Sequence, residues 1–174
     1  MHESVIDSVI LHAQTRVRAC FAVAVVFLSH SLMFGSNSWQ ETLAADSAKK
    51  ARDHFIQGTM LQIQGRRHAE AILEFQQSLR YDSSAITIGS IARSYAELRK
   101  YPLAVEYAEA SLQRDSALVS SWSILAEMRV AMGEYDAAIA AYENVVRLEP
   151  TRTHVLTLAR LVEPRNASRA IALY

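Results

Sequence analysis

Histidine is the side chain best suited to ligate a metal or to act as a general base near neutral pH, and the chain has six of them. They stand far apart in the sequence, at His2, His12, His30, His54, His68 and His154. No pair has the spacing of an HExxH zinc site, and the sequence contains neither a phosphate-cradling glycine loop nor a nucleophile elbow. We therefore expect no catalytic residue, no metal site and no cofactor, and we expect that the protein is not an enzyme.

The remaining reactive side chains favour structural roles. Cys20 is the single cysteine and lies in the most apolar stretch of the chain, which favours packing as a small hydrophobic residue. His54 is expected to pack in or beside the core, and His68 to lie in a solvated basic turn. With 18 basic and 18 acidic residues, the formal net charge is zero. Such a balance gives no long-range attraction to nucleic acid or to an anionic membrane.

An apolar run near the N-terminus predicts export or membrane attachment. It spans residues 19–34, and Arg16 and Arg18 precede it directly. A basic flank before a short apolar run is typical of a secretory signal peptide. Ser29, His30 and Ser31 interrupt the run before it reaches the roughly 20 residues of a membrane span.

Two alternatives follow for this segment. Residues 1–38 form either a cleaved signal peptide or a retained signal-anchor, since acidic residues and an unusually long leader precede the run. Residues 39–50 are expected to be a linker. The protein is then either exported, to a periplasmic or other extracytoplasmic space, or anchored to the membrane by this N-terminal segment.

The middle of the chain repeats itself with a period of 34 residues. Segments 85–118 and 119–152 align without gaps and match Ala92 with Ala126, Ala104 with Ala138, and Tyr101 with Tyr135. Segment 51–84 fits less regularly, since its second half is offset by 33 residues. A fixed period of this length indicates a stack of similar structural units.

Residues 119–152 resemble the tetratricopeptide repeat family. The resemblance rests on Trp122, Leu125, Ala126, Gly133, Tyr135, Ala138, Tyr142 and Pro150. Segment 85–118 departs from the pattern at Ile88, where the family often has Trp, and at Arg99, where it often has Gly. The resemblance implies an all-α fold, a right-handed superhelical stack of antiparallel helix pairs, with three repeats at 51–84, 85–118 and 119–152.

The apolar pattern supports this fold independently of the family. Apolar residues recur at spacings of three and four, as in amphipathic helices. Small residues recur once per first helix at Gly58, Ala92 and Ala126, and once per second helix at Ala71, Ala104 and Ala138. Small side chains at these positions let paired helices approach closely.

The resemblance also implies a concave binding groove lined by the first helix of each repeat. The expected groove residues are Arg52, Phe55, Thr59, Gln62 and Ile63, then Ile86, Gly89, Arg93, Ala96 and Glu97, then Ser120, Ser123, Glu127, Val130 and Ala131. Arg93 could bind a carboxylate or pair with Glu97 one turn later. We expect an adaptor or scaffold that binds a peptide or protein segment here, and no nucleic acid.

The C-terminal region predicts a second surface. Residues 153–174 begin a fourth repeat and stop short, which predicts an exposed apolar edge at Val155, Leu158, Leu161 and Val162. Such an edge would support self-association into a homo-oligomer, or docking as a structural subunit of an envelope complex. In the opposite case the final helix, in residues 168–174, folds over this edge.

Overall fold

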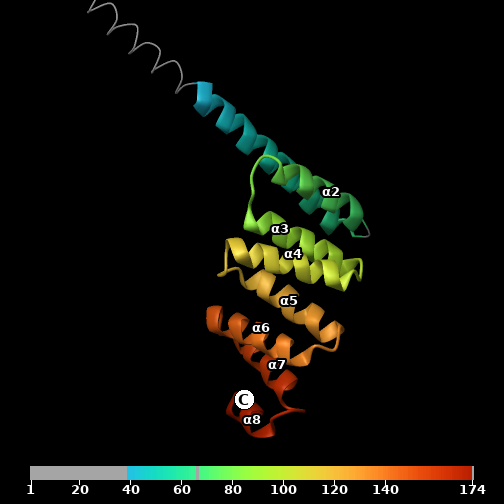
Figure 1. The fold of residues 1–174 in the computed structure, drawn as a ribbon, viewed down its shortest axis with the longest axis vertical. Coiled ribbons are helices and arrows are strands. Elements are labelled where there is room, and N and C mark those ends of the chain that lie inside the picture. The colour runs from blue at the N-terminus through green and yellow to red at the C-terminus, as the bar shows by residue number, and fades with distance from the viewer. Residues whose placement is uncertain (1–38, 66, 174) are drawn as a thin grey trace, which may run out of the picture. The chain divides into compact units, whose positions relative to one another are not determined.

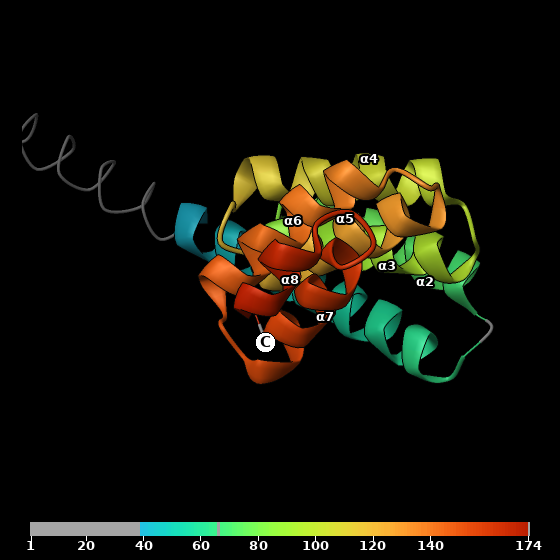
Figure 2. The ribbon, with the colours of Figure 1, turned by 90° about the horizontal axis from the view of Figure 1, so that it is seen from below.

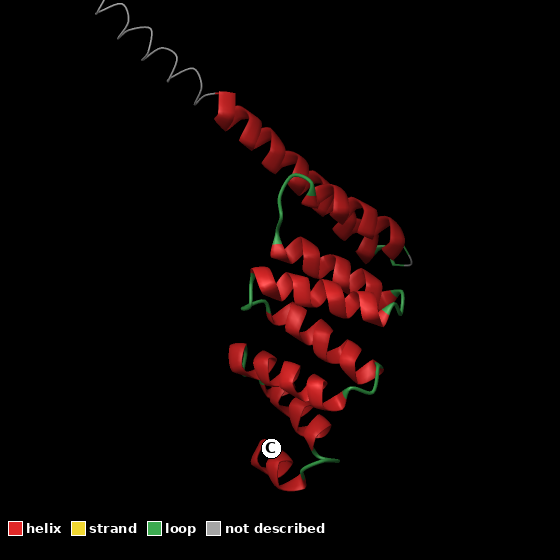
Figure 3. Ribbon diagram, viewed as in Figure 1, coloured by secondary structure: helices red, strands yellow, loops and turns green. Residues whose placement is uncertain are grey.

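The computed structural model describes residues 39–65 and 67–173, and these form only helices and loops (Figure 3). The chain divides into two compact units, residues 1–46 and 47–174. In the first unit the described residues 39–46 are helical. The segment predicted to be a signal peptide or anchor, 1–38, lies outside the described residues. No helix in the described part of the chain is long and apolar enough to span a membrane.

The second unit is a stack of antiparallel helices (Figure 1). Its first helix covers residues 47–63. The others are α2 (His68–Leu79), α3 (Ala85–Glu97), α4 (Tyr101–Arg114), α5 (Val119–Ala131), α6 (Tyr135–Leu148), α7 (Arg152–Val162) and α8 (Ala167–Leu173). Each expected repeat therefore contains one pair of helices. The all-α stack of helix pairs predicted from the sequence is present in the structure.

The pairs have an inner and an outer layer. Seen along the stack in Figure 2, α4 and α6 lie on one side, while α7 and the helix of residues 47–63 lie on the other. Short turns connect the layers. Gly133 adopts φ of +80° between α5 and α6, and Arg99 adopts φ of +55° at the equivalent turn between α3 and α4. The departure from glycine at residue 99 thus leaves the turn geometry in place, at the cost of a strained non-glycine backbone.

Small side chains set the distance between paired helices, as the sequence indicates. Ala92, Ala104, Ala126 and Ala138 are all fully buried. At the equivalent position of the first repeat, Gly58 lies against the ring of Phe75, and an added Cβ would sit 2.7 Å from that ring. One buried cluster joins three of these alanines to larger apolar side chains, and its members are Ala92, Ala104, Ala108, Ile124, Leu125, Ala126, Met128 and Ala141.

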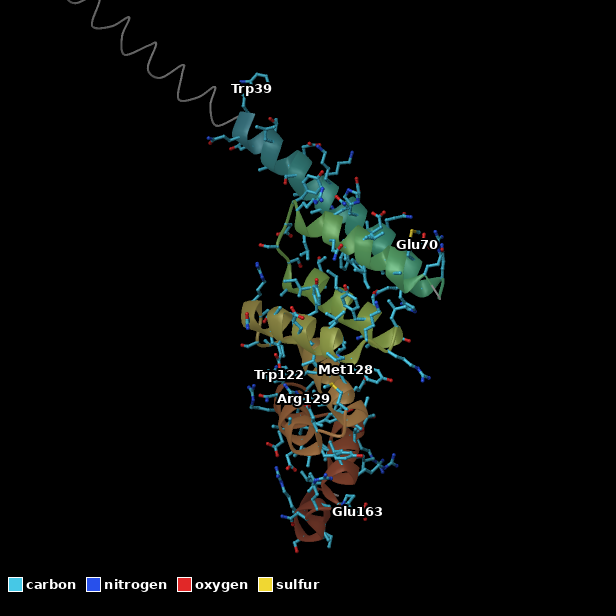
Figure 4. The ribbon with its side chains drawn as sticks, turned by 45° about the vertical axis from the view of Figure 1, so that its right-hand side comes forward. Trp39, Glu70, Trp122, Met128, Arg129 and Glu163 are labelled. Carbon is cyan, nitrogen blue, oxygen red and sulfur yellow. The ribbon has the colours of Figure 1, made fainter. Side chains whose placement is uncertain are left out.

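Trp122 and Arg129, both on α5 (Figure 4), contact the segments that flank this helix. The indole nitrogen of Trp122 donates a hydrogen bond to the carbonyl of Ser116, 2.9 Å away. Near the other end, Arg129 forms ion pairs with Glu109 at 2.6 Å and with Glu134 at 2.9 Å. The groove face of α5 is therefore presented by a fixed helix.

Two sequence-based expectations need correction. Residues 39–50, expected to be a linker, are helical. The predicted exposed apolar edge is wrong at Leu158 and Val162, whose exposed fractions are 3% and 2%. Both side chains pack with Ala170 of α8, and Ile139 and Tyr142 of α6 complete the cluster. Val155 and Leu161 are half-buried. The final helix, α8, therefore covers the part of the edge formed by Leu158 and Val162.

Candidate functional site

The first helices of successive repeats lie next to one another along the inner layer. The side-chain amide of Gln62 donates hydrogen bonds to the carbonyl of Ser90 and to the hydroxyl of Ser94, both at 2.8 Å. Helix 47–63 is thereby bonded to α3, and α3 in turn packs against α5. These three helices form a continuous surface, which is called the groove below.

The expected groove residues divide into exposed and half-buried sets. Arg52, Ile63, Ile86, Arg93, Glu97, Ser120, Glu127 and Ala131 are exposed. Phe55, Thr59, Gln62, Ala96, Ser123 and Val130 are half-buried. Gly89 is buried, so it supports the groove without offering a side chain. The first set can contact a ligand directly.

Several half-buried residues satisfy their hydrogen bonds within the fold. Thr59 donates to the carbonyl of Phe55 at 2.9 Å, and Ser123 donates to that of Val119 at 3.0 Å. The ring of Phe55 packs 5.7 Å from that of Phe75. These residues form the floor of the groove.

Four exposed groove residues carry charges without ion-pair partners. Arg52, Arg93, Glu97 and Glu127 make no side-chain hydrogen bond and no ion pair within the part of the chain that the structure describes. Of the two alternatives for Arg93, the ion pair with Glu97 is therefore not formed. These charges remain available to a ligand.

The charges at the centre of the groove influence one another at longer range. The pKa of Glu127 is raised, first because neighbouring helices partly bury its carboxylate. Arg93 lowers this pKa and Glu97 raises it. The pKa of Tyr142, on α6, is raised by its own burial and by Glu127. Opposite charges from α3 and α5 thus lie close enough to act on one ligand.

Outside the groove, ion pairs are common. Arg67 pairs with Glu70 at 2.5 Å, and Arg169 with Glu143. Arg165 pairs with Asp136 at 3.3 Å. The last two pairs border a pocket of about 350 Å³ beside α8. The charged side chains around this pocket form ion pairs with each other, whereas those of the groove do not.

A smaller pocket of about 220 Å³ opens at the N-terminal end of the groove. Three expected groove residues line it: Arg52, Phe55 and Ile86. Sequence reasoning missed the other important lining residues, Ser78, Asp82 and Thr87. A signal was present, because Ser78 and Thr87 align with Ser111 and Ser121 of the following repeat.

The remaining candidate side chains do not form a chemical site. Nδ1 of His54 lies 2.8 Å from a carboxylate oxygen of Glu74, and its ring stacks on Tyr81 with centroids 6.0 Å apart. These contacts hold helix 47–63 to α2. Among the described residues, no three His, Cys, Asp or Glu side chains are grouped closely enough to hold a metal ion.

Comparison with known proteins agrees with this architecture. Residues 121–156 match the profile of the family described as "Tetratricopeptide repeat". No curated protein matches the chain.

Solved structures share the fold at low sequence identity. The first TPR of Spaghetti (RPAP3) bound to the HSP90 peptide SRMEEVD is 22% identical, with a TM-score of 0.62 over 72% of this chain and 95% of that one. The Arabidopsis OM64 TPR domain is 17% identical, with a TM-score of 0.63 over 68% and 98%. MamA is 17% identical, with a TM-score of 0.65 over 79% and 81%. These similarities concern the fold.

Proposed function

We propose that this tetratricopeptide repeat protein is a non-enzymatic adaptor that binds a peptide or protein segment in the groove formed by helix 47–63, α3 and α5. The observation that carries the proposal is the set of unpaired charges on this surface. Arg52, Arg93, Glu97 and Glu127 are free of ion pairs within the described structure, so this surface presents unpaired charges of both signs to a ligand.

The groove charges favour a ligand that carries charges of both signs. Arg93 can pair with an acidic side chain or a terminal carboxylate, and Glu97 and Glu127 can pair with a basic side chain. Complementary charges mainly determine the orientation and specificity of a bound segment. The exposed apolar side chain of Ile86, with an exposed fraction of 57%, adds surface that a ligand can bury.

Peptide binding by similar structures supports the proposal. The Spaghetti domain holds an HSP90 peptide, and the second TPR domain of human RPAP3 is in complex with the HSP70 peptide SGPTIEEVD. A groove between first helices can accommodate an extended or helical segment. The apolar residues at 19–34 lead us to propose, in addition, that the protein is exported or tethered to a membrane by its N-terminal segment.

A random dodecapeptide display library, panned on the purified chain, tests the groove proposal. We expect a shared motif among the enriched peptides. Charge reversal in Arg93→Glu or Glu127→Lys should weaken binding of a synthetic enriched peptide by about tenfold or more, because like charges then face each other.

Matched controls use charges on the outer helices. Arg147→Glu on α6 and Glu106→Lys on α4 change exposed residues of the same kinds, and they should leave the affinity within about twofold. If no motif is enriched, or if groove and control variants bind equally well, the groove is not the binding surface.

A further inference from the structure

The pocket at the N-terminal end of the groove is lined by a buried threonine whose hydroxyl has no hydrogen-bond partner among the described residues. Thr87 is 2% exposed and lines the pocket. Its side chain makes no hydrogen bond to any described residue. The Thr87 hydroxyl is not completely enclosed. Among the described residues, the one completely enclosed side-chain nitrogen or oxygen without a partner is Nδ1 of His68. Thr87 therefore contributes an unpaired hydroxyl to the lining of the pocket, and a polar atom of a ligand could pair with it.

In the next repeat, the equivalent hydroxyl is paired with another side chain. There Ser121, the equivalent of Thr87, has its hydroxyl 2.8 Å from that of Ser111. Ser111 also donates to the carbonyl of Ala85 at 2.8 Å. One repeat earlier, Ser78 makes the equivalent bond to the carbonyl of Ala51 at 2.8 Å. No bond joins Ser78 to Thr87, so the junction of the first two repeats stays open where the following junction is sealed.

The walls of the pocket suit one side chain. Its volume of about 220 Å³ is below the roughly 300–1,000 Å³ of sites for drug-sized ligands. Ala48, Ala51 and Phe55 provide apolar walls, and Ile86 extends them into the groove. Arg52 and Asp82, of opposite charge, also line the pocket. The formal charges of this lining sum to zero, so an ion entering the pocket gains no net attraction to offset its desolvation, which favours a neutral side chain.

We propose that this pocket is a specificity subsite of the groove and receives a tyrosine side chain of the bound peptide, with the phenol hydroxyl hydrogen-bonded to Thr87. The inference rests on the proposed function, because the tyrosine belongs to a segment held in the groove. Tyrosine combines a large apolar body with a polar tip that finds a hydrogen-bond partner when buried. Phenylalanine would fill the same space but leave the Thr87 hydroxyl unpaired.

The test uses the purified 174-residue chain and peptides enriched from the random dodecapeptide library. Tyrosine should be enriched at one fixed position of the motif. Replacing it with phenylalanine in the synthetic peptide should weaken binding about 3- to 10-fold, as for the loss of one hydrogen bond. In the nearly isosteric Thr87→Val variant, the tyrosine and phenylalanine peptides should bind with equal affinity.

A second pair of variants tests the pocket without relying on the folding of Thr87→Val. Ile86 is exposed, so Ile86→Ser should preserve the fold while removing apolar wall, and should weaken the tyrosine peptide by several-fold. Leu73→Ser changes a comparably exposed residue, at 61% against 57%, on α2, and should have no effect. Circular dichroism and thermal melting check that each variant is folded.

Failure of the subsite is distinguishable from failure of the groove. The subsite proposal is overturned if tyrosine is not enriched, or if the preference for tyrosine over phenylalanine persists in Thr87→Val. If Arg93→Glu still abolishes binding in either case, the groove function stands without the subsite. If Arg93→Glu and Glu127→Lys also bind normally, both proposals fall.

Discussion

Gly89 shows how one residue sets the spacing between neighbouring repeats. A Cβ at this position would lie 2.8 Å from the hydroxyl oxygen of Ser121 and 3.3 Å from that of Ser111. Those two hydroxyls are bonded to each other in the buried junction of α4 and α5. The glycine therefore provides room for a polar contact that joins two repeats. The resemblance to the tetratricopeptide repeat implies that residue 89 is a groove position, but it does not indicate this supporting role.

We predict that Gly89→Ala destabilises the protein by about 1–3 kcal/mol, the usual cost of overpacking. Helix propensity alone predicts the opposite, a gain of roughly 0.5–1 kcal/mol for replacing glycine in a helix. Chemical denaturation measures the difference. The double variant Gly89→Ala/Ser121→Ala should recover part of the loss, because it removes the closest atom. A stabilised Gly89→Ala protein would show that the junction tolerates the methyl group.

The ionisation of Glu127, a groove residue, makes the stability of the fold depend on pH. Its pKa is raised mainly by burial, with Glu97 of α3 adding to the rise and Arg93 opposing it. In the unfolded chain the carboxyl has its ordinary pKa, so the folded protein holds the proton more strongly. Ionisation of Glu127 therefore opposes folding as the pH rises from the ordinary carboxyl range through the raised pKa.

We predict that Glu127→Gln raises the melting temperature slightly near neutral pH, with a gain within about 0.5 kcal/mol because the residue is exposed. At about pH 3, where both the folded and unfolded carboxyl are protonated, the difference should disappear. Glu106→Gln replaces an exposed glutamate on α4 and serves as the control for the substitution itself; it should leave the melting temperature near neutral pH unchanged. A Glu127→Gln protein that is less stable near neutral pH would contradict the assigned direction.

At the scale of the element, α8 determines whether the apolar side chains at the C-terminal edge are exposed. The sequence shows that α7 has an apolar face, but it left open whether α8 covers that face. Burial of Ala170 against Leu158 and Val162 settles this in favour of coverage. Residues 39–50 were misjudged for a related reason. Their small and polar composition suggested a linker, although Ala, Glu, Gln and Lys are good helix formers.

We predict that Ala170→Glu displaces α8 by placing a charge in the apolar contact with α7. Stability should fall by about 1–3 kcal/mol, and the exposed Leu158 and Val162 should promote self-association. Light scattering measures the association. Ala172→Glu, at an exposed position of the same helix, should remain like the wild type. Equal behaviour of the two variants would mean that α8 does not protect this end.

At the scale of the whole second unit, the repeat period carries most of the predictable information. A period of 34 residues and the recurring small residues were sufficient to predict the helix pairs, whereas the groove position of Arg93 and Glu127 is implied by the resemblance to the tetratricopeptide repeat. The pocket beside Thr87 was not predictable in this way, because it arises from a difference between repeats. Ser78 and Thr87 remain apart, while Ser111 and Ser121 are bonded, and a sequence pattern does not show which hydroxyls meet.

Hydrogen–deuterium exchange of the chain with and without an enriched peptide tests most directly whether the groove of helix 47–63, α3 and α5 is the binding surface. Bound peptide should slow exchange in these three helices and leave α4, whose face lies in the outer layer, unchanged. Protection confined to α7 and α8, with none in α3 or α5, would contradict groove binding and place the ligand at the C-terminal end of the stack.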